Sequence, residues 1–184
     1  EIQHLPQYAE DLFSETVKVP KDGKYNFVFA GNIGDMQSVE TIVKAANELR
    51  RRSDIIFHIV GDGSKLEECK ELSDKLKLTN ITYYGRKPVS EMPHFYGLAD
   101  AMLLTLKDNR TISYTLPGKV QSYMAASKPI IAAINGEANR VIKGADCGFC
   151  CDAENYKELA NLIIRFCDSD NKERMAKNSY DYYI

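Results

Sequence analysis

The sequence predicts an α/β protein with a Rossmann-like, doubly wound parallel sheet of six strands. Short apolar runs alternate with segments of helical periodicity along almost the whole chain of 184 residues. The apolar runs are nearly continuous, which is typical of parallel strands that helices cover on both faces. Parallel strands need crossover connections, and right-handed helical crossovers make such a sheet doubly wound.

Six apolar segments are expected to form the strands. Each has four to six residues, a length that is typical of strands and too short for buried helices. In chain order they are residues 26–30 (NFVFA), 55–60 (IIFHIV), 81–84 (ITYY), 101–106 (AMLLTL), 130–133 (IIAA) and 148–151 (GFCC).

Helices are expected in the intervals between the strands. Apolar residues recur at the spacing of one helix face over residues 39–49 and again over residues 66–76. Ser90 is expected to cap a short helix that ends near Leu98. The remaining helices are predicted for the stretch after Pro117 and for residues 137–143, 156–167 and 172–183.

The chain has the size of one ordinary domain, but its first residues differ from the rest. Residues 1–20 lack strand periodicity, and we interpret them as a linker that leads into a domain over residues 21–184. Because the chain starts in a linker and stops in a helix, we expect it to be a domain excised from a longer protein. Its hydrophobic content of 44% and net charge of -2 indicate a globular domain without an electrostatic footprint for nucleic acid. No apolar run approaches the ~20 residues of a membrane span.

Several residues that often bind metals or perform catalysis are better explained by the core. Cys147 and Cys150 have CxxC spacing, but no second CxxC or histidine pair supports a zinc site, so we expect reduced, buried strand cysteines. An odd count of five cysteines favours a reducing, cytoplasmic location. His58 lies in an apolar strand and is expected to be a core histidine with satisfied hydrogen bonds. The five methionines, Met92 among them, are interpreted as core filling.

The loops that follow strands are the candidate ligand sites, because ligands of doubly wound sheets bind outside the carboxyl ends of the strands. Gly31, Asn32 and Gly34 follow the first strand, where glycines let backbone N–H groups approach a phosphate or sugar. A tight connection without a ligand has the same sequence. The loop matches neither GxGxxG nor GxxxxGK[ST], which disfavours a dinucleotide enzyme or a P-loop NTPase. Residues 61–64 (GDGS) follow the second strand, where they could approach a ligand in the same way or form a turn with Ser64 as a helix cap.

Basic residues follow the third and fourth strands. Gly85 and Arg86 end the third, where the Arg86 cation is explained equally by contact with a base and by solvation. The polar loop after the fourth strand carries Lys107, Arg110 and Tyr114. The two cations could neutralise a diphosphate, and the tyrosine could stack or donate a hydrogen bond.

Residues 115–133 (TLPGKVQSYMAASKPIIAA) carry the most functional information. The helix after Pro117 begins beside the polar loop, and a helix N-terminus presents unpaired N–H groups and a partial positive charge that suit phosphates. Lys119 in its first turn could neutralise a diphosphate or be a solvated surface lysine. Glu137 places a carboxylate at a later helix start, where favourable first-turn charge explains it equally well.

Four blocks follow one another along the chain: FVFAGNIG (27–34), HIVGDGSKLEE (58–68), ITYYGRKPVSEMPHFYGLADAMLL (81–104) and TLPGKVQSYMAASKPIIAA (115–133). Together they resemble the C-terminal domain of retaining GT-B glycosyltransferases of the group 1, family 4 type, in the family's order and spacing. The Gly-Asn-Ile-Gly loop followed by Gln37 is similar to the branch that builds bacterial surface polysaccharides. The segment QYAEDLF (7–13) resembles the linker between the two halves of such enzymes.

The resemblance implies one half of a GT-B fold, the donor-binding domain. It implies hexosyltransferase-like, retaining transfer of a sugar from a nucleotide diphosphate sugar, expected to be UDP-linked, to a glycan or lipid-linked acceptor. Neither a metal nor a cofactor is expected. The candidates for catalysis are Glu137 and Lys119. The donor-binding residues expected from the loops and the resemblance are Gly31, Asn32, Gly34, Gly85, Arg86, Lys107, Arg110, Tyr114, Thr115, Leu116, Pro117, Lys119 and Ser122.

The sequence departs from the family pattern at the glutamates. Many members carry two glutamates eight positions apart, the first on the donor sugar and the second on the ribose; the aligned positions here are Tyr114 and Ser122. Ribose recognition is therefore expected to differ and to involve Ser122 or Gln121. The usual Arg and Lys pair near the first helix is missing too, which leaves Lys119 or the two cations of the preceding loop to neutralise phosphate.

The expected partners are a nucleotide sugar and the missing N-terminal acceptor domain, without nucleic acid. Without that domain the chain is expected to be inactive. The enzyme is expected in the cytoplasm, where any peripheral contact with the inner membrane face would involve the absent domain. Two other functions fit part of the sequence. A sugar-nucleotide epimerase half-domain needs acidic and histidine groups at the cleft, where only Glu137 is well placed. A non-catalytic nucleotide-binding α/β module would carry an acidic cluster after the first strand, where this chain has Gly-Asn-Ile-Gly instead.

Overall fold

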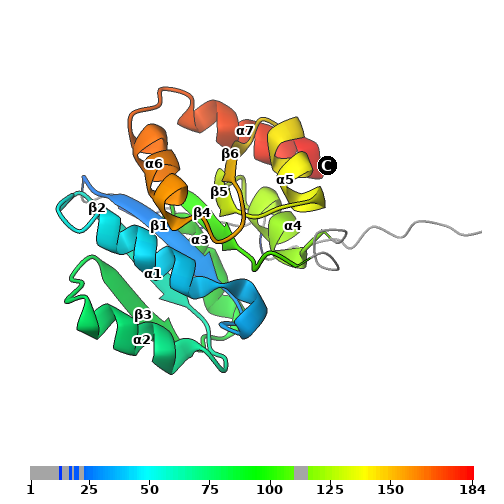
Figure 1. Ribbon diagram of the computed structural model, residues 1–184. Coiled ribbons are helices and arrows are strands. Elements are labelled where there is room, and N and C mark those ends of the chain that lie inside the picture. The colour runs from blue at the N-terminus through cyan, green and yellow to red at the C-terminus, as the bar shows by residue number, and fades with distance from the viewer. Residues whose placement is uncertain (1–12, 14–16, 18, 21–22, 110–115) are drawn as a thin grey trace, which may run out of the picture.

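A computed structural model describes residues 13, 17, 19–20, 23–109 and 116–184 of the chain (Figure 1). Its centre is a six-stranded sheet of order β3-β2-β1-β4-β5-β6 in which all five strand pairs are parallel. The strands are β1 (Tyr25–Ala30), β2 (Ile55–Val60), β3 (Ile81–Gly85), β4 (Ala101–Thr105), β5 (Ile130–Ala133) and β6 (Gly148–Cys151). The predicted Rossmann-like sheet is thus confirmed.

Helices cover both faces of this sheet. The α-helices are α1 (Val39–Glu48), α2 (Leu66–Lys75), α3 (Met92–Leu98), α4 (Gly118–Ala125), α5 (Glu137–Gly144), α6 (Tyr156–Cys167) and α7 (Lys172–Tyr183). Apolar residues of α1, α2 and α6 share one core layer, and those of α3, α4 and α5 share the layer on the opposite face. Helix α7 lies against α4 (Figure 1). No helix among the described residues is long and apolar enough to cross a membrane.

The short helix expected from Ser90 differs in its start. A 3-10 turn, η3 (Val89–Glu91), precedes α3, and neither element has a side-chain cap. The predicted Ser90 cap is therefore wrong. Pro93 lies in the first turn of α3, where its missing N–H costs no helical hydrogen bond. Likewise Ser64 does not cap α2, whose N-cap residue is Lys65.

The sheet opens between its two central strands. Strands β1 and β4 pair at Phe27–Ala101 and Val28–Met102, and no later pair joins them. Alternate residues of a parallel strand turn their backbone groups to opposite neighbours, so Ala30 lacks a partner on the β4 side. The Tyr123 hydroxyl of α4 replaces that strand: it donates to the Ala30 carbonyl oxygen at 3.1 Å and accepts from the Ala30 N–H at 3.3 Å.

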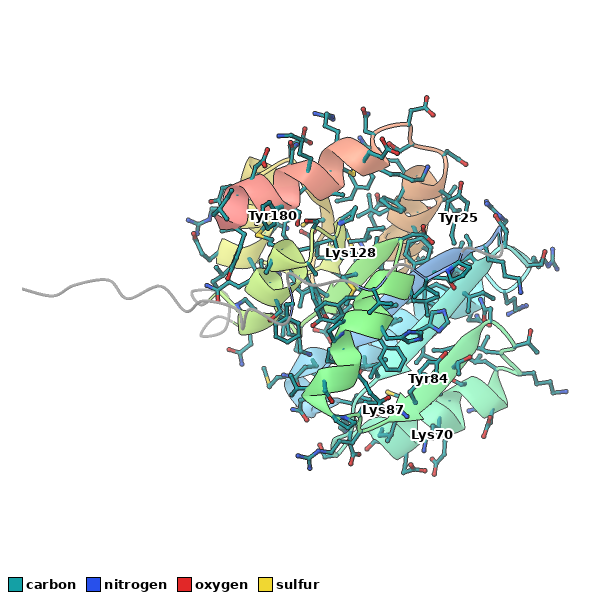
Figure 2. All side chains as sticks on the ribbon, turned by 180° about the vertical axis from the view of Figure 1, so that it is seen from behind. Tyr25, Lys70, Tyr84, Lys87, Lys128 and Tyr180 are labelled. Carbon is teal, nitrogen blue, oxygen red and sulfur yellow. The ribbon has the colours of Figure 1, made fainter. Side chains whose placement is uncertain are left out.

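The expected core assignments of polar residues are mostly confirmed. His58 is 7% exposed, and its ring nitrogens lie 2.9 Å from the Tyr84 hydroxyl and 2.9 Å from Asn26 Oδ1. Tyr84 lies on the sheet face that α3 covers (Figure 2). Cys147 and Cys151 are buried free thiols, and burial raises the pKa of each to about 11, whereas Cys150 of the CxxC is a free thiol that is only half-buried. In the part of the chain that is described, no group of three His, Cys, Asp or Glu residues could hold a metal ion.

The described residues of the first segment pack on α3. The Phe13 ring stacks on Tyr96 with centroids 5.3 Å apart, and the Val17 N–H donates to the Pro93 carbonyl oxygen at 3.4 Å. A Cβ atom at Gly97 would lie 1.9 Å from the Val17 carbonyl oxygen, so only glycine admits this contact. The assignment of residues 1–20 as an interdomain linker stays a prediction.

The substitution Tyr123→Phe is expected to lower the free energy of unfolding by about 1–3 kcal/mol, because it leaves a buried N–H and a buried carbonyl without a partner. Urea unfolding measures this change. Tyr182→Phe is the matched control, since the Tyr182 side chain is 54% exposed. Equal stabilities of the two variants would contradict the role given to the Tyr123 hydroxyl.

Candidate functional site

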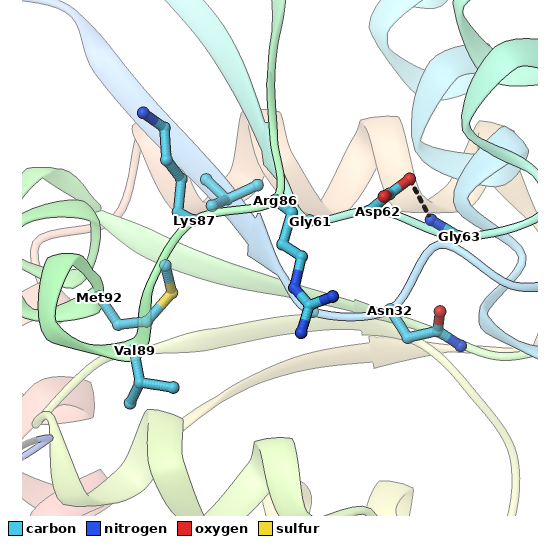
Figure 3. Close-up of a pocket in the computed structure, with 10 residues that line it drawn as sticks. Asn32, Gly61, Asp62, Gly63, Arg86, Lys87, Val89 and Met92 are labelled. Carbon is cyan, nitrogen blue, oxygen red and sulfur yellow. Dashed lines mark hydrogen bonds between the residues drawn. The ribbon is translucent and has the colours of Figure 1, made fainter.

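A pocket of about 640 Å³ lies at the carboxyl ends of β1, β2 and β3, the edge at which ligands of doubly wound sheets bind (Figure 3). Each strand contributes the loop that follows it, and the start of α3 closes one side. The lining residues are Gly31, Asn32, Val60, Gly61, Asp62, Gly63, Arg86, Lys87, Val89 and Met92.

The loop after β1 is held by its own hydrogen bonds. The N–H groups of Gly31 and Ile33 donate to the Val60 and Asp62 carbonyl oxygens, each at 2.8 Å. The Gly34 N–H donates to Gln37 Oε1 at 3.2 Å. The N–H groups of Gly31 and Gly34, which we expected to face a phosphate, therefore already have partners within the protein.

The glycines of the pocket let two backbones meet. A Cβ atom at Gly61 would lie 1.8 Å from the Gly31 carbonyl oxygen, and one at Gly63 would lie 2.5 Å from the Ile33 carbonyl oxygen. Both glycines have positive φ angles, 140° and 154°, which L side chains rarely adopt. The loops after β1 and β2 are therefore bonded backbone to backbone and together form the floor of the pocket. The sequence of residues 61–64 did not predict this contact between the loops.

The charged residues of the pocket are not equally available. The Arg86 guanidinium points into the space between Asn32 and Met92, whereas the Lys87 side chain points the other way (Figure 3). Lys87 Nζ lies 3.5 Å from a Glu91 carboxylate oxygen, while no ion-pair partner of Arg86 exists in the described ranges. Asp62 uses one carboxylate oxygen to accept the Gly63 N–H at 2.7 Å. Arg86 is thus the unneutralised cation of the pocket wall.

A second cation lies behind the pocket. Lys119 in the first turn of α4 has a buried ammonium, which has no hydrogen-bond partner among the residues that the structure describes. It lies 4.1 Å from the centroid of the Phe29 ring, a cation–π distance. A Cβ atom at Gly31 would lie 2.2 Å from Lys119 Cε and 2.5 Å from Nζ. Glycine at position 31 is therefore required for the lysine to reach this place. Burial lowers the pKa of Lys119 to about 8.

The family model for glycosyl transferases group 1 matches residues 13–182, which is most of the chain. This chain belongs to the glycosyl transferases group 1 family. A probable glycosyltransferase of Pseudomonas aeruginosa, WbjE, is 30% identical over 157 residues, which cover 84% of this chain and 39% of that protein. The glycosyltransferase chain thus spans about two fifths of the length of this relative.

Solved structures share the fold of this group 1 glycosyltransferase chain. The C-terminal domain of a group 1 family protein, LpcC, from Francisella tularensis has a TM-score of 0.71, with 22% identity over 87% of this chain and 84% of that one. HepE of Anabaena, solved in complex with UDP and glucose, has a TM-score of 0.72 with 17% identity over 88% of this chain and 44% of that one. At these identities the likeness concerns the fold.

The other predicted site residues lie in several places. Lys107 is not in the pocket: its ammonium lies 2.6 Å from Asp35, and this bond raises the pKa of Lys107. Gly85 accepts the Gly61 N–H at 2.9 Å through its carbonyl oxygen. The Ser122 hydroxyl donates within α4, to the Gly118 carbonyl oxygen at 3.4 Å.

Further candidates lie near the start of α4 or away from the pocket. Leu116 packs against the core layer of α3, α4 and α5, and Pro117 is the N-cap residue of α4. Glu137 forms an exposed ion pair with Arg140 at 3.2 Å. Three candidates lie outside the described residues, namely Arg110, Tyr114 and Thr115.

Sequence reasoning missed part of the pocket. Met92 packs against the core layer of α3, α4 and α5, as predicted, but it also lines the pocket beside Val89, which is 50% exposed. Asp62 and Gly63 also line the pocket, although the sequence explains their loop equally by a turn and they are not among the expected donor-binding residues. The signal for all of them was their position, since each lies in or just after a loop that follows a strand at the ligand-binding edge.

We predict that Lys119→Met raises the free energy of unfolding at pH 7 by about 1–2 kcal/mol, because it removes a buried, unpaired charge that the Phe29 ring only partly compensates. The folded-state pKa of about 8 lies below the value of roughly 10.4 in the unfolded chain. The unfolded state therefore binds more protons between these values, and the wild-type protein gains stability as pH rises from about 8 to about 10. The advantage of the variant should shrink over the same range.

Urea unfolding at pH 7 and pH 9.5 measures both effects. Lys70→Met is the matched control, since Lys70 lies on the surface of α2 in an exposed pair with Glu67 (Figure 2). A Lys119→Met variant that is less stable than the wild type at pH 7 would contradict the cost assigned to the buried ammonium.

Proposed function

We propose that this chain is the donor-binding half of a retaining glycosyltransferase and that its pocket holds a nucleotide diphosphate sugar. The observation that carries the proposal is the pocket itself. It lies at the carboxyl edge of the sheet beside the opening between β1 and β4, and two unneutralised cations, Arg86 and Lys119, flank Gly31 and Asn32. Its volume of about 640 Å³ lies within the range of ~300–1,000 Å³ for small-molecule sites.

Two further observations support a donor with a uridine diphosphate. HepE, which shares the fold, was solved with UDP and glucose. The pocket also combines an apolar rim of Val89 and Met92 with the Arg86 guanidinium, a combination that suits the flat face and polar edge of a base. We therefore propose that the base lies toward Arg86 and the diphosphate toward Gly31.

The proposed chemistry needs stabilisation of a departing diphosphate and of an oxocarbenium-like sugar. Preorganised cations supply the first without a metal, because they act where negative charge develops in the transition state. Of the two catalytic candidates, the geometry favours Lys119, because its ammonium lies beside Gly31 of the pocket, whereas Glu137 is paired with Arg140. The acceptor is proposed to be a glycan or a lipid-linked sugar, held by a second domain.

A half-built cleft is expected to bind donor without transferring it. Holding donor and acceptor together supplies much of the rate of a bimolecular transfer, and this chain spans 39% of its relative WbjE. We predict binding of UDP-sugar to the isolated chain but no sugar release above the uncatalysed rate, measured by UDP formation. Transfer to an added glycan acceptor by the isolated chain would contradict this prediction.

Arg86→Ala is expected to weaken nucleotide binding about tenfold, because it removes a charged contact from the pocket wall. Calorimetry with UDP, GDP and ADP measures the affinities and identifies the preferred base. Lys177→Ala, on the exposed face of α7, controls for the loss of one positive charge. The proposed function is refuted if the wild-type chain binds none of the three nucleotides or their sugars.

A further inference from the structure

The Lys119 ammonium is an exception among the polar groups of the described residues. Only it and the Asn80 side-chain oxygen are buried without a hydrogen-bond partner there. An ammonium can donate three hydrogen bonds, and burying it with none made is unfavourable. A hydrophobic side chain would fill this place at lower cost. A buried ammonium without a partner is expected where a ligand supplies the missing hydrogen bonds.

The fold brings Lys119 to the point where the sheet opens. Tyr123, one helical turn further along α4, is fixed to the backbone of Ala30, so the first turn of α4 lies over the end of β1. Phe29 belongs to the core layer on the face of the sheet opposite to α4. The lysine side chain therefore passes beyond the last pair of β1 and β4 to reach the Phe29 ring.

Gly31 joins this buried place to the pocket. It lines the pocket, and it is also the residue whose missing Cβ makes room for the end of the lysine. Only Gly31 thus lies between the ammonium and the pocket. Rotation about the four side-chain bonds of lysine can move the charge over such a distance without any change of the backbone.

The other lysines near this edge already have partners. Lys107 is paired with Asp35 at 2.6 Å, Lys65 with Glu68 at 2.7 Å and Lys87 with Glu91 at 3.5 Å. An anion that drew one of them away would have to break an ion pair, whereas Lys119 has none to lose among the described residues. The partial positive charge at the start of α4 favours an anion at the same place.

We propose that Lys119 binds the diphosphate of the donor, and that its ammonium leaves the Phe29 ring and enters the pocket past Gly31 when the anion is bound. This inference rests on the proposed function, because it assumes that the pocket takes a nucleoside diphosphate. It assigns the role of the missing Arg and Lys pair near the first helix to a residue of α4. In this protein the lysine stays retracted until the ligand arrives.

Binding of the diphosphate by Lys119 should be coupled to uptake of a proton. The pKa of the retracted lysine is about 8, and an adjacent diphosphate raises it, since a nearby opposite charge favours the charged form. Binding at pH 8 should then take up about half a proton per ligand, and the affinity should fall about fourfold between pH 7 and pH 8.5. A variant without Lys119 should show neither this proton uptake nor this loss of affinity.

The test compares the tightest binder among UDP, GDP and ADP with its own nucleoside, which lacks the phosphates. For Lys119→Met we expect diphosphate binding to weaken about tenfold or more, and nucleoside binding, followed by ligand-observed NMR, to stay within about twofold of the wild type. Lys65→Met is the matched control, because its ammonium is paired outside the pocket. Calorimetry of the wild type at pH 8 in HEPES and in Tris measures the proton uptake, which does not depend on how well any variant folds.

The outcomes separate the two proposals. If the wild type binds no nucleotide, the proposed function fails and this inference fails with it. If the wild type binds a diphosphate, but Lys119→Met binds it equally well or no proton is taken up at pH 8, the inference is overturned while the proposed function stands. A loss of diphosphate affinity in Lys107→Met, with none in Lys119→Met, would instead assign the role to the loop after β4.

Discussion

The bond between the Tyr123 hydroxyl and the backbone of Ala30 is the constraint on which the site depends. In a doubly wound sheet the two central strands separate toward their carboxyl ends, and the backbone groups exposed by the separation must find partners. Here one hydroxyl from α4 satisfies both the N–H and the carbonyl of the last residue of β1. This contact fixes α4 over the opening, and with it the lysine one turn earlier.

The loops on the β1 side of the opening are firmly held. The loops after β1 and β2 are bonded backbone to backbone, with Gly61 and Gly63 at positions where no other residue fits without strain. This rigid floor leaves few N–H groups for a ligand, so binding charge must come from side chains. In our proposal Arg86 and Lys119 supply this charge from opposite directions, Arg86 from the pocket wall and Lys119 from behind Gly31.

The cost of burying the Lys119 ammonium without a partner connects it to the neighbouring pocket. A charge kept without partners destabilises the folded domain, and it becomes favourable only when an anion pairs with it. Membership of the glycosyl transferases group 1 family makes a diphosphate the natural candidate for that anion. The proposed retraction of Lys119 links the stability of the empty domain to the binding of its ligand, and both to pH.

The sequence by itself determined the sheet, most helices and the family, because these depend on local periodicity and on motifs that are contiguous in the chain. Helices α6 and α7 have the predicted bounds, and His58 is the core histidine that its strand implied. Only the tertiary structure decided which loop groups are free. Lys107 and Asp35 are 72 positions apart, and Lys119 meets Phe29 and Gly31 across the opening of the sheet. Neither contact can be seen as a local pattern in the sequence. Each forms because the strand order brings loops that are distant in the chain to the carboxyl edge of the sheet.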